Sequence, residues 1–354
     1  MARGPHLHEI TARLQEMGGK PAHLRRIYRS WMGLADWTPG RKDRFPKAIA
    51  EHLDEIRAEL EAISRVEPVE SAEAESMKLI VGFPDGECVE SVLLPRKGLC
   101  VSTQVGCAVG CVFCMTGRGG LIRQLSSAEI VAQVREGLRI RPDTKKVVLM
   151  GMGEPSHNLD AVVEAVDFMG NVLGLAHKDI VVSTVGDRRL FAKLPTMSVK
   201  PALALSLHTT DNAKRRELLP RSPAIPVEEL LSTVLDYAEA TKYPLQIEWT
   251  LMAGVNDSEA EVERLADLIE GRLAMVNFIA VNPIPGEPFR RPEEAHMQDL
   301  ITILRRRGIV ATIRNSAAQD VEGGCGQLRA RVLGIVPAEV AAEAGEEADR
   351  LAKA

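Results

Sequence analysis

Residues 105–117 read Val-Gly-Cys-Ala-Val-Gly-Cys-Val-Phe-Cys-Met-Thr-Gly, so that Cys107, Cys111 and Cys114 form a CxxxCxxC motif on one short segment. Structural zinc sites have four protein ligands, and an iron–sulfur cluster held entirely by protein needs four cysteines. Three cysteines therefore suit a [4Fe-4S] cluster that leaves one iron open to a further ligand. The alternative is a zinc site or three buried thiols, but free cysteines are rarely so clustered.

The composition outside this motif is that of an ordinary soluble protein. Of 354 residues, 45% are hydrophobic and 26% are charged, which excludes a disordered or fibrous chain. The sequence has no apolar run of the roughly 18 to 20 residues that span a bilayer and no signal-peptide pattern, so we expect a cytoplasmic protein without a membrane partner. Six cysteines in so long a chain do not make a disulfide framework, and Cys88 is interpreted as core packing.

Charge is unevenly distributed, although the net charge is only −5. Residues 1–50 contain ten basic and four acidic residues, whereas residues 51–76 contain two basic and nine acidic residues. The basic segment could contact RNA phosphates, but solvated helix faces have a similar composition. The ten basic residues are Arg3, Arg13, Lys20, Arg25, Arg26, Arg29, Arg41, Lys42, Arg44 and Lys47.

Apolar residues at helical spacing predict a small helical module at the N-terminus. The acidic stretch 67–75 is interpreted as a linker or exposed turn, and the runs 77–83 and 89–95 as two strands. The helical sets are Leu7, Ile10, Leu14 and Met17; Leu24, Ile27, Tyr28 and Trp31; and Ile49, Leu53, Ile56 and Leu60.

From residue 99 onward, short apolar runs alternate with amphipathic stretches. Repeated βα units with continuous apolar strands predict an α/β fold with a parallel sheet, either doubly wound or curled into a full or partial barrel. The final stretch from Pro337 is rich in Ala and Glu and is interpreted as a surface helix or tail. The predicted strands are 99–103, 146–150, 180–184, 202–207, 246–251, 276–281 and 310–314, and the predicted helices are 126–138, 159–173, 227–241 and 258–272.

A polar motif follows each of five predicted strands. Because ligands bind at the carboxyl ends of parallel strands, we expect these motifs to converge in space. They are the cysteine motif, Gly151-Met152-Gly153-Glu154-Pro155, Ser183-Thr184-Val185-Gly186, Ser206-Leu207-His208 and Asn282-Pro283.

Each motif has a plain structural interpretation when taken singly. Gly151 and Gly153 could form only a tight turn, although Gly153 would also let a ligand approach and Glu154 could accept hydrogen bonds from an amino group. Serine and asparagine side chains bind ribose or adenine but also cap helices. His208 alone is more often a structural histidine than a catalyst. Their convergence favours a binding site.

Cys100 and Cys325 remain to be explained. Cys325 lies in Gly323-Gly324-Cys325-Gly326, and flanking glycines indicate an accessible, reactive thiol. A fourth cluster ligand, a structural cysteine and a redox pair with Cys100 are the open alternatives, of which reactivity and access favour the pair.

Together these motifs resemble the RlmN/Cfr family of radical S-adenosylmethionine RNA methyltransferases. The similarity covers nearly the whole chain and rests on the run from Cys100 to Cys107, the cysteine motif, residues 151–155, 206–208, 282–283 and 325–328. It implies a partial barrel of six βα units with a small N-terminal helical domain. The implied domains are 1–76, helical and RNA-binding; 77–98, a β-hairpin connector; 99–335, the barrel with a catalytic C-terminal cysteine loop; and 336–354, a tail.

The resemblance also implies a mechanism, because the electron-poor carbons of adenine cannot attack the methyl group of S-adenosylmethionine as nucleophiles. By similarity, Cys325 takes a methyl group from one S-adenosylmethionine. A second molecule on the cluster gives a 5′-deoxyadenosyl radical, which abstracts hydrogen from that methyl group, and the carbon radical adds to adenine. Glu90 matches the family's proton acceptor, and Cys100 releases the product by attacking the Cys325 sulfur, which leaves a transient disulfide.

The implied cofactors are a [4Fe-4S] cluster held by Cys107, Cys111 and Cys114 and S-adenosylmethionine. The implied target is carbon 2 of an adenosine in 23S rRNA and/or tRNA, with carbon 8 as the alternative of the Cfr branch. The expected electron donor is a protein such as flavodoxin or ferredoxin, and the expected state is a monomer. The residues implied to line S-adenosylmethionine are Gly153, Glu154, Ser183, Ser206, Leu207, His208 and Asn282.

Three departures from the family pattern suggest a divergent paralogue: Met115, Thr209-Thr210 and Gly323-Gly324 stand where the family usually has other residues. They put the target in more doubt than the reaction. The rival functions are a radical enzyme acting on a peptide or small molecule, and a non-enzymatic iron–sulfur or zinc protein.

Overall fold

The structure is a computed structural model, and it describes residues 4–38, 44–73, 75–282, 284 and 286–328. Pro283, the predicted tail 336–354 and the basic residues Arg3, Arg41 and Lys42 lie outside the described residues.

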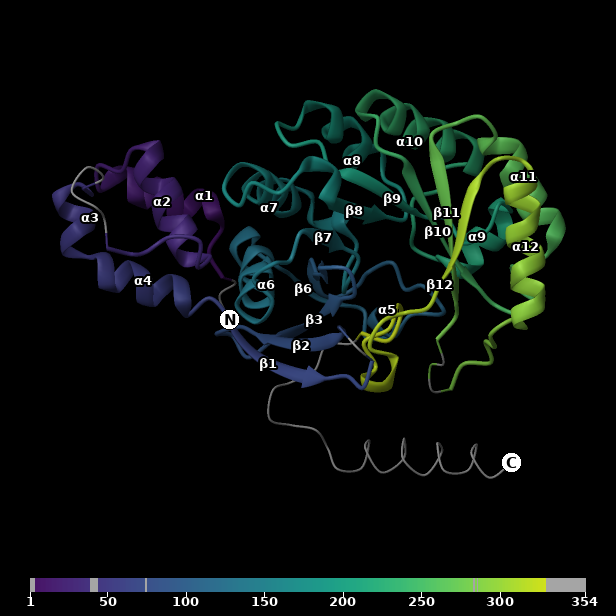
Figure 1. Ribbon diagram of the computed structural model, residues 1–354, viewed down its shortest axis with the longest axis horizontal. Helices are drawn as coiled ribbons and strands as arrows, with labels where there is room; N and C mark the ends of the chain where they lie inside the picture. The colour runs from purple at the N-terminus through teal and green to yellow at the C-terminus, as the bar shows by residue number, and fades with distance from the viewer. Residues whose placement is uncertain (1–3, 39–43, 74, 283, 285, 329–354) are drawn as a thin grey trace.

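One ten-stranded sheet forms the centre of the molecule, in the order β1-β2-β3-β4-β7-β8-β9-β10-β11-β12 (Figure 1). Strands β4 and β7 to β12 are parallel, and β1 to β4 continue the sheet as antiparallel neighbours. A two-stranded ribbon of β5 and β6 lies outside this sheet. The strands are β1 (Arg65–Glu70), β2 (Met77–Gly82), β3 (Cys88–Leu94), β4 (Gly98–Cys100), β5 (Gln104–Gly106), β6 (Leu121–Gln124), β7 (Lys146–Leu149), β8 (Ile180–Thr184), β9 (Ala202–Ser206), β10 (Leu245–Leu251), β11 (Ala274–Ala280) and β12 (Val310–Arg314).

Helices connect the parallel strands and cover the outer face of the curved sheet (Figure 1). Seven parallel strands joined by six such crossovers, with β1 and β12 at open edges, make a partial barrel, so the predicted fold is confirmed. The helices are α1 (Leu7–Glu16), α2 (Pro21–Trp31), α3 (Lys47–Glu51), α4 (Leu53–Glu61), α5 (Met115–Arg118), α6 (Ser127–Ile140), α7 (Leu159–Asn171), α8 (Arg188–Lys193), α9 (Asn212–Leu218), α10 (Val227–Thr241), α11 (Glu259–Ile269) and α12 (Glu294–Arg306), with short 3₁₀ turns at Pro155–Asn158, His177–Asp179, Leu194–Thr196 and Gln319–Val321.

The core lies between the sheet and its outer helices. Strand β8 is buried along its whole length, as a strand covered on both faces must be. Trp249 and Phe278 are paired in register on β10 and β11, and their fully buried rings pack edge to face with centroids 6.0 Å apart. Large apolar residues such as these lie on the outer face of the sheet, where the helices pack on them. Because side chains alternate along a strand, the residues between them lie on the inner face.

The N-terminal helices α1 to α4 form a lobe that lies against α6 and α7 (Figure 1). Tyr28 and Trp31 of α2 pack edge to face on Phe168 of α7, with ring centroids 5.2 and 6.2 Å away. Arg29 donates a hydrogen bond to the Val172 carbonyl at 3.0 Å, and Arg135 of α6 donates to the Trp31 carbonyl at 3.0 Å. The lobe is therefore docked by aromatic packing and by two arginines.

One interpretation from sequence was wrong in part. Residues 67–70 of the expected acidic linker belong to strand β1, because an edge strand exposes its carboxylates and tolerates Pro68. In residues 77–98, β2 and β3 form an antiparallel hairpin, and β3 pairs with the barrel strand β4, so this hairpin is continuous with the main sheet. In the part of the chain that the structure describes, every helix is too short or too polar to cross a lipid bilayer.

Candidate functional site

The three motif cysteines lie on the loop between β5 and α5, which the β5–β6 ribbon supports. The Cys107 amide donates to the Gly120 carbonyl at 2.9 Å, and the Cys114 amide donates to the Cys111 carbonyl at 3.1 Å. Cys107 is buried, and Cys111 and Cys114 are half-buried. The loop packs into a separate apolar cluster whose buried members are Cys107, Val109, Phe113, Val185, Leu218, Leu219, Met252 and Val281.

The three thiols lie close enough for their charges to affect one another. Burial raises the pKa of Cys107 to about 12, and the charges of Cys114 and Glu154 raise it further against two backbone hydrogen bonds that lower it. Burial also raises the pKa of Cys111, and the next largest causes are Cys114 and Cys107. Thiols that burial and neighbouring negative charges keep protonated lose their protons more readily when a cationic centre binds between them. This donor set fits an iron–sulfur cluster.

Glu154 is held beside the cysteine loop by the end of β8. Its Oε1 accepts hydrogen bonds from the Thr184 hydroxyl at 2.6 Å and the Ser156 amide at 3.0 Å, and its Oε2 accepts from the Val185 amide at 3.0 Å. A carboxylate oxygen has two acceptor sites, so Oε2 keeps one for an ammonium group. Thr184 and Val185 belong to a motif that was expected to lie here, but their role in orienting this carboxylate was not predicted.

Gly153 has no room for a side chain. Its φ is +99°, and a Cβ there would lie 2.6 Å from the side chain of Gln104. Gln104 in turn accepts a hydrogen bond from the Glu154 amide at 2.7 Å. The glycine therefore allows β5 and the β7 loop to pack closely and fixes where Glu154 points.

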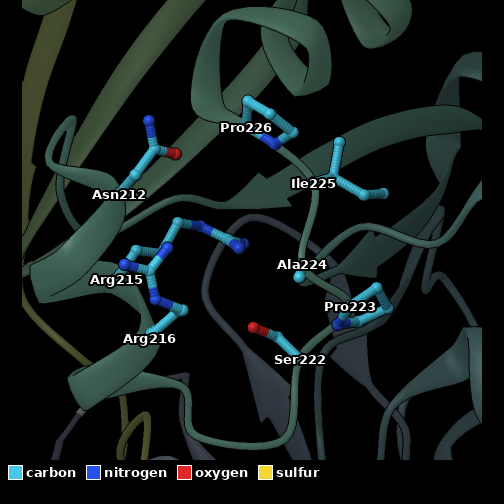
Figure 2. A pocket seen from close by; sticks show the side chains of 8 residues that line it. All are labelled: Asn212, Arg215, Arg216, Ser222, Pro223, Ala224, Ile225 and Pro226. Carbon is cyan, nitrogen blue, oxygen red and sulfur yellow. The ribbon is translucent and has the colours of Figure 1, made fainter.

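Arg215 of α9 places a buried cation next to this group. It donates hydrogen bonds to the carbonyls of Val185 and Ser206 at the ends of β8 and β9. Burial lowers its pKa to about 10, while the nearby Cys111 and Glu154 oppose that change. Arg215 also lines a cavity of about 230 Å³ between α9 and α10 (Figure 2). None of the site residues predicted from sequence is among the eight residues drawn there.

The strand register places four predicted site residues on the inner face of the sheet. Val92 is opposite Cys100, so Glu90, two residues from Val92, shares the face of Cys100. The same alternation from β7 through β9 puts Ser183 and Ser206 on this face, and their hydroxyls are 3.4 Å apart. These residues come from four strands, and the fold brings them to one surface.

Glu90 has an unexpected partner. Its carboxylate pairs with the ammonium group of Lys78 at 3.4 Å, and both side chains are almost fully buried. The Ser102 hydroxyl donates to the Glu90 carbonyl at 2.6 Å, which ties β3 to the end of β4. Lys78 was not predicted as a site residue, because a lysine near the start of a strand is normally exposed to solvent.

The C-terminal cysteine loop packs directly on the motif loop. The Met115 amide donates to the Gly326 carbonyl at 2.7 Å, and the Thr116 hydroxyl donates to the Leu328 carbonyl at 2.5 Å. Asn282 donates to the Ser316 hydroxyl at 2.8 Å and to the Cys325 carbonyl at 2.9 Å. Both amide hydrogens of Asn282 are therefore used to hold the loop.

Cys325 and Cys100 lie near each other. Cys325 is exposed, whereas Cys100 is buried on the inner face. Burial raises the pKa of Cys100 to about 12, and the charge of Cys325 is the second largest cause of this increase. Although the Cys325 residue is exposed at the surface, protein atoms around its sulfur reduce the hydration of the thiolate and raise the pKa of Cys325, and Cys114 contributes to the same change. The Cys100 and Cys325 thiols are thus close enough for their charges to interact, and Cys325 is also affected by the charge of Cys114 in the motif loop.

Leu207 and His208 have structural contacts. Leu207 is buried, and its amide donates to the Glu248 carbonyl at 3.0 Å. The Nδ1 atom of His208 accepts from the Thr250 amide at 2.9 Å, and its ring lies 4.8 Å from Phe113 in the motif loop. Burial lowers the pKa of His208 to about 3, so it stays neutral. This histidine supports the motif loop without a charge.

Comparisons with known proteins agree with this geometry. Residues 101–269 match the Radical SAM superfamily. A probable RNA methyltransferase of Azoarcus sp. (strain BH72) is 52% identical over 328 residues, which cover 92% of this chain and 94% of that protein. A probable RNA methyltransferase of Thiobacillus denitrificans (strain ATCC 25259 / T1) is 51% identical over 334 residues, covering 94% and 92%.

The crystal structure of a radical SAM methyltransferase from Sphaerobacter thermophilus is 34% identical, superimposes with a TM-score of 0.80, and covers 92% of this chain and 98% of its own. This chain belongs to the radical SAM methyltransferases. It is thus an S-adenosylmethionine-dependent enzyme with a [4Fe-4S] cluster, as the resemblance in its sequence implied.

The radical SAM barrel also contains a polar network on the inner face of β10 to β12, which was not predicted from the sequence. Glu248 of β10 accepts a hydrogen bond from Asn277 at 2.8 Å, and Asn277 accepts one from Thr312 at 3.0 Å. Arg314 lies 3.5 Å from the Glu248 carboxylate. Burial raises the pKa of Glu248, against opposing effects of Arg314, Asn277 and Lys146. Polar residues at alternate positions of otherwise apolar strands were the available signal.

Proposed function

We propose that this enzyme methylates an adenosine of RNA, at carbon 2, through a methyl group carried on Cys325, with 23S rRNA and/or tRNA as the substrate. The relatives named above are described as probable RNA methyltransferases, which supports RNA as the substrate class. Carbon 8 is the alternative position.

One observation carries the proposal: the exposed Cys325 lies close enough to the buried Cys100 for their charges to interact. A thiol that accepts a group from solution must be accessible, whereas a thiol that resolves an intermediate can be sheltered. The pair therefore divides attack and release between two positions.

When bound, the cluster and S-adenosylmethionine would supply the methyl group, the acceptor for one hydrogen atom of that methyl group, and the acceptor for the one electron left over when the new carbon–carbon bond forms. Cys325 holds that group as a thioether, whose carbon bonds to the adenosine carbon and joins protein to RNA. Glu90 takes the proton that the adenosine carbon loses. Cys100 then attacks the Cys325 sulfur: a disulfide forms, the sulfur–carbon bond breaks, and the released carbon gains a proton. A two-electron reductant returns both thiols.

The contacts around the motif loop suggest how the cofactors are held. Cys107, Cys111 and Cys114 would ligate the cluster, and the free acceptor site of Glu154 would bind the amino group of S-adenosylmethionine. Ser183 and Ser206, on the inner face, would bind ribose hydroxyls. Gly153, Leu207, His208 and Asn282 would shape the site through the close packing and loop contacts described above.

The N-terminal lobe is proposed to bind RNA with its exposed basic residues. Arg25, Lys20 and Arg44 are exposed. Phe45 packs edge to face on His23 with centroids 6.1 Å apart, so Arg44 lies near the helix that carries Arg25. We further propose a monomer that receives electrons from a protein such as flavodoxin or ferredoxin.

Arg26 and Arg29 are already engaged within the protein. Arg26 donates to the Asp36 and Thr38 carbonyls at 3.1 and 2.8 Å, and Arg29 donates to the Val172 carbonyl. Of the three arginines in α2, Arg25 is thus the candidate for phosphate contact.

Cys325→Ala and Cys100→Ala test the proposal by opposite outcomes. The Cys325 variant should form neither a protein-bound methyl group nor an RNA adduct. The Cys100 variant should accumulate a covalent protein–RNA adduct, visible on denaturing gels as a band that ribonuclease removes. Cys88→Ala, at a buried cysteine of β3, is the matched control and should methylate RNA normally.

Normal methylation by the Cys100 variant, with no adduct, would refute the two-cysteine route. Mass spectrometry of nucleosides from rRNA and tRNA treated with the wild-type enzyme should show methyladenosine, and its retention time distinguishes carbon 2 from carbon 8. Turnover of S-adenosylmethionine without any methylated nucleoside would favour a peptide or small-molecule substrate instead.

A further inference from the structure

Two histidines of the N-terminal lobe and a glutamate of α7 form a cluster far from the cysteines in sequence. The Nδ1 atoms of His6 and His8 lie 3.7 and 3.3 Å from one oxygen, Oε2, of Glu164. All three atoms lie within 4.8 Å of one another. In tetrahedral zinc sites, with bonds of about 2.0 to 2.2 Å, ligand atoms are separated by about 3.4 Å. The distances of 3.7 and 3.3 Å bracket that value.

The hydrogen bonds around this cluster show which of its atoms are acceptors. The Ser127 amide donates to His6 Nδ1 at 3.3 Å, so this nitrogen carries no hydrogen, as a metal ligand requires, and a bound ion would take the place of this hydrogen bond. The Ser127 hydroxyl donates to Glu164 Oε2 at 2.5 Å and accepts from the Leu7 amide at 2.8 Å. His8 Nδ1 lies within hydrogen-bond distance of the same carboxylate oxygen, at 3.3 Å. His6 Nδ1 and Glu164 Oε2 are thus two acceptors 3.7 Å apart, an arrangement that a cation bound by both would stabilise.

We propose that His6, His8 and Glu164 bind one divalent transition metal ion, zinc in the first instance, which fastens the N-terminal lobe to the barrel. Two imidazoles and one carboxylate suit zinc, whereas magnesium and calcium prefer oxygen ligands alone. The His8 side chain is 68% exposed, which leaves a fourth position open to water. Ser127 is the outer partner that orients the carboxylate.

The position of the cluster gives such an ion a structural role. His6 and His8 are at the start of α1, Glu164 is in α7, and Ser127 begins α6, so one ion would join three helices at the lobe–barrel contact (Figure 1). This contact is also where Tyr28 packs on Phe168. The proposal does not depend on the RNA substrate or on the two-cysteine route.

The test uses the full chain, purified anaerobically with its iron–sulfur cluster so that the motif cysteines are occupied. Titration with Zn²⁺ should show one bound zinc per chain in addition to the cluster iron, and Co²⁺ should give the visible absorption of a tetrahedral site. Zinc should also raise the melting temperature. His8→Ala and Glu164→Gln should abolish these three effects, and Ser127→Ala should weaken binding about 10- to 100-fold.

His52→Ala is the matched control, because His52 is an exposed histidine between α3 and α4, and it should bind zinc like the wild type. Since His8 is exposed, its alanine variant should keep its fold, which circular dichroism and the iron content would establish. The proposal is wrong if folded His8→Ala binds zinc as tightly as the wild type. It is equally wrong if zinc binding disappears when Cys107, Cys111 and Cys114 are all replaced by Ala.

Discussion

At the scale of single residues, the enzyme keeps several ionisable groups out of water, and each has a partner that limits the cost. Glu90 is paired with Lys78, Glu248 is bonded to Asn277, and Arg215 is bonded to strand carbonyls. A buried charge is costly unless it is paired and hydrogen-bonded. Glu90, the proposed proton acceptor, is therefore held in the fold by Lys78.

Lys78→Met should destabilise the protein by about 3 to 5 kcal/mol, because it leaves the Glu90 carboxylate buried without its cationic partner. Glu90→Gln in the same chain should recover part of that loss, since a neutral amide needs no counter-charge. Urea denaturation of the wild type, both single variants and the double variant measures the coupling. Additive effects of the two substitutions would mean that the pair does not stabilise the fold.

Individual site residues could be predicted from sequence where chemistry needs a rare pattern, as in Cys107, Cys111 and Cys114. Glu154 was predicted from the motif that contains it, and Thr184 and Val185 are in a second predicted motif, but the hydrogen bonds between the two motifs were not predicted. Lys78 and Glu90 meet because β2 and β3 pair in one register, with Val92 opposite Lys78. A sequence read by itself does not give register, so contacts across strands remained hidden.

At the scale of elements, the lobe is positioned by α2, whose arginines have different tasks. Arg29 reaches the carbonyl that ends α7, and cations at helix C-termini are favoured there. Arg25 is exposed, and it makes no such contact within the part of the chain that the structure describes. The same helix thus provides a docking residue and a candidate phosphate contact.

Arg29→Ala should loosen the lobe, because it removes a hydrogen bond from a charged donor worth about 1.5 to 3 kcal/mol. Hydrogen exchange should accelerate in α1 to α4 but not in the barrel. Arg25→Ala is the matched variant: it should leave exchange unchanged while lowering the salt slope of RNA binding by about 0.7 to 0.9. Unchanged exchange in the Arg29 variant, or an unchanged slope in the Arg25 variant, contradicts the respective role.

Most elements of the barrel could be predicted, since continuous apolar runs such as Ile180–Thr184 and helices such as Val227–Thr241 have clear patterns. Strand β1 was missed because Glu67 and Glu70 suggest a linker, and only the neighbouring β2 makes a strand of it. Helix α12 (Glu294–Arg306) was missed because its apolar positions follow a loop rich in proline.

At the scale of the whole molecule, the active site is closed by two loops that are about two hundred residues apart in sequence. The segment with Cys325 follows β12, the last strand of the barrel, and it bonds to Met115 and Thr116, which precede six of the seven parallel strands in sequence. A long-range closure of this kind cannot be predicted from local patterns. The position of the Cys325 thiol therefore depends on contacts between distant parts of the chain.

Gly326→Ala should separate the two loops. Gly326 has a φ of +81°, and a Cβ there would lie 2.9 Å from the Phe113 carbonyl, so the loop must shift and lose its bond to the Met115 amide. The left-handed backbone alone costs an alanine about 1 to 2 kcal/mol. We expect normal iron content, because the motif cysteines are untouched, but a reduction of more than about tenfold in S-methylation of Cys325, measured by peptide mass spectrometry.

Gly308→Ala is the control that separates backbone strain from loss of the loop contact, since Gly308 has a φ of +72° and no atom within 4 Å of the added Cβ. Equal losses of S-methylation in both variants would attribute the effect to strain in general and remove the role of the loop contact.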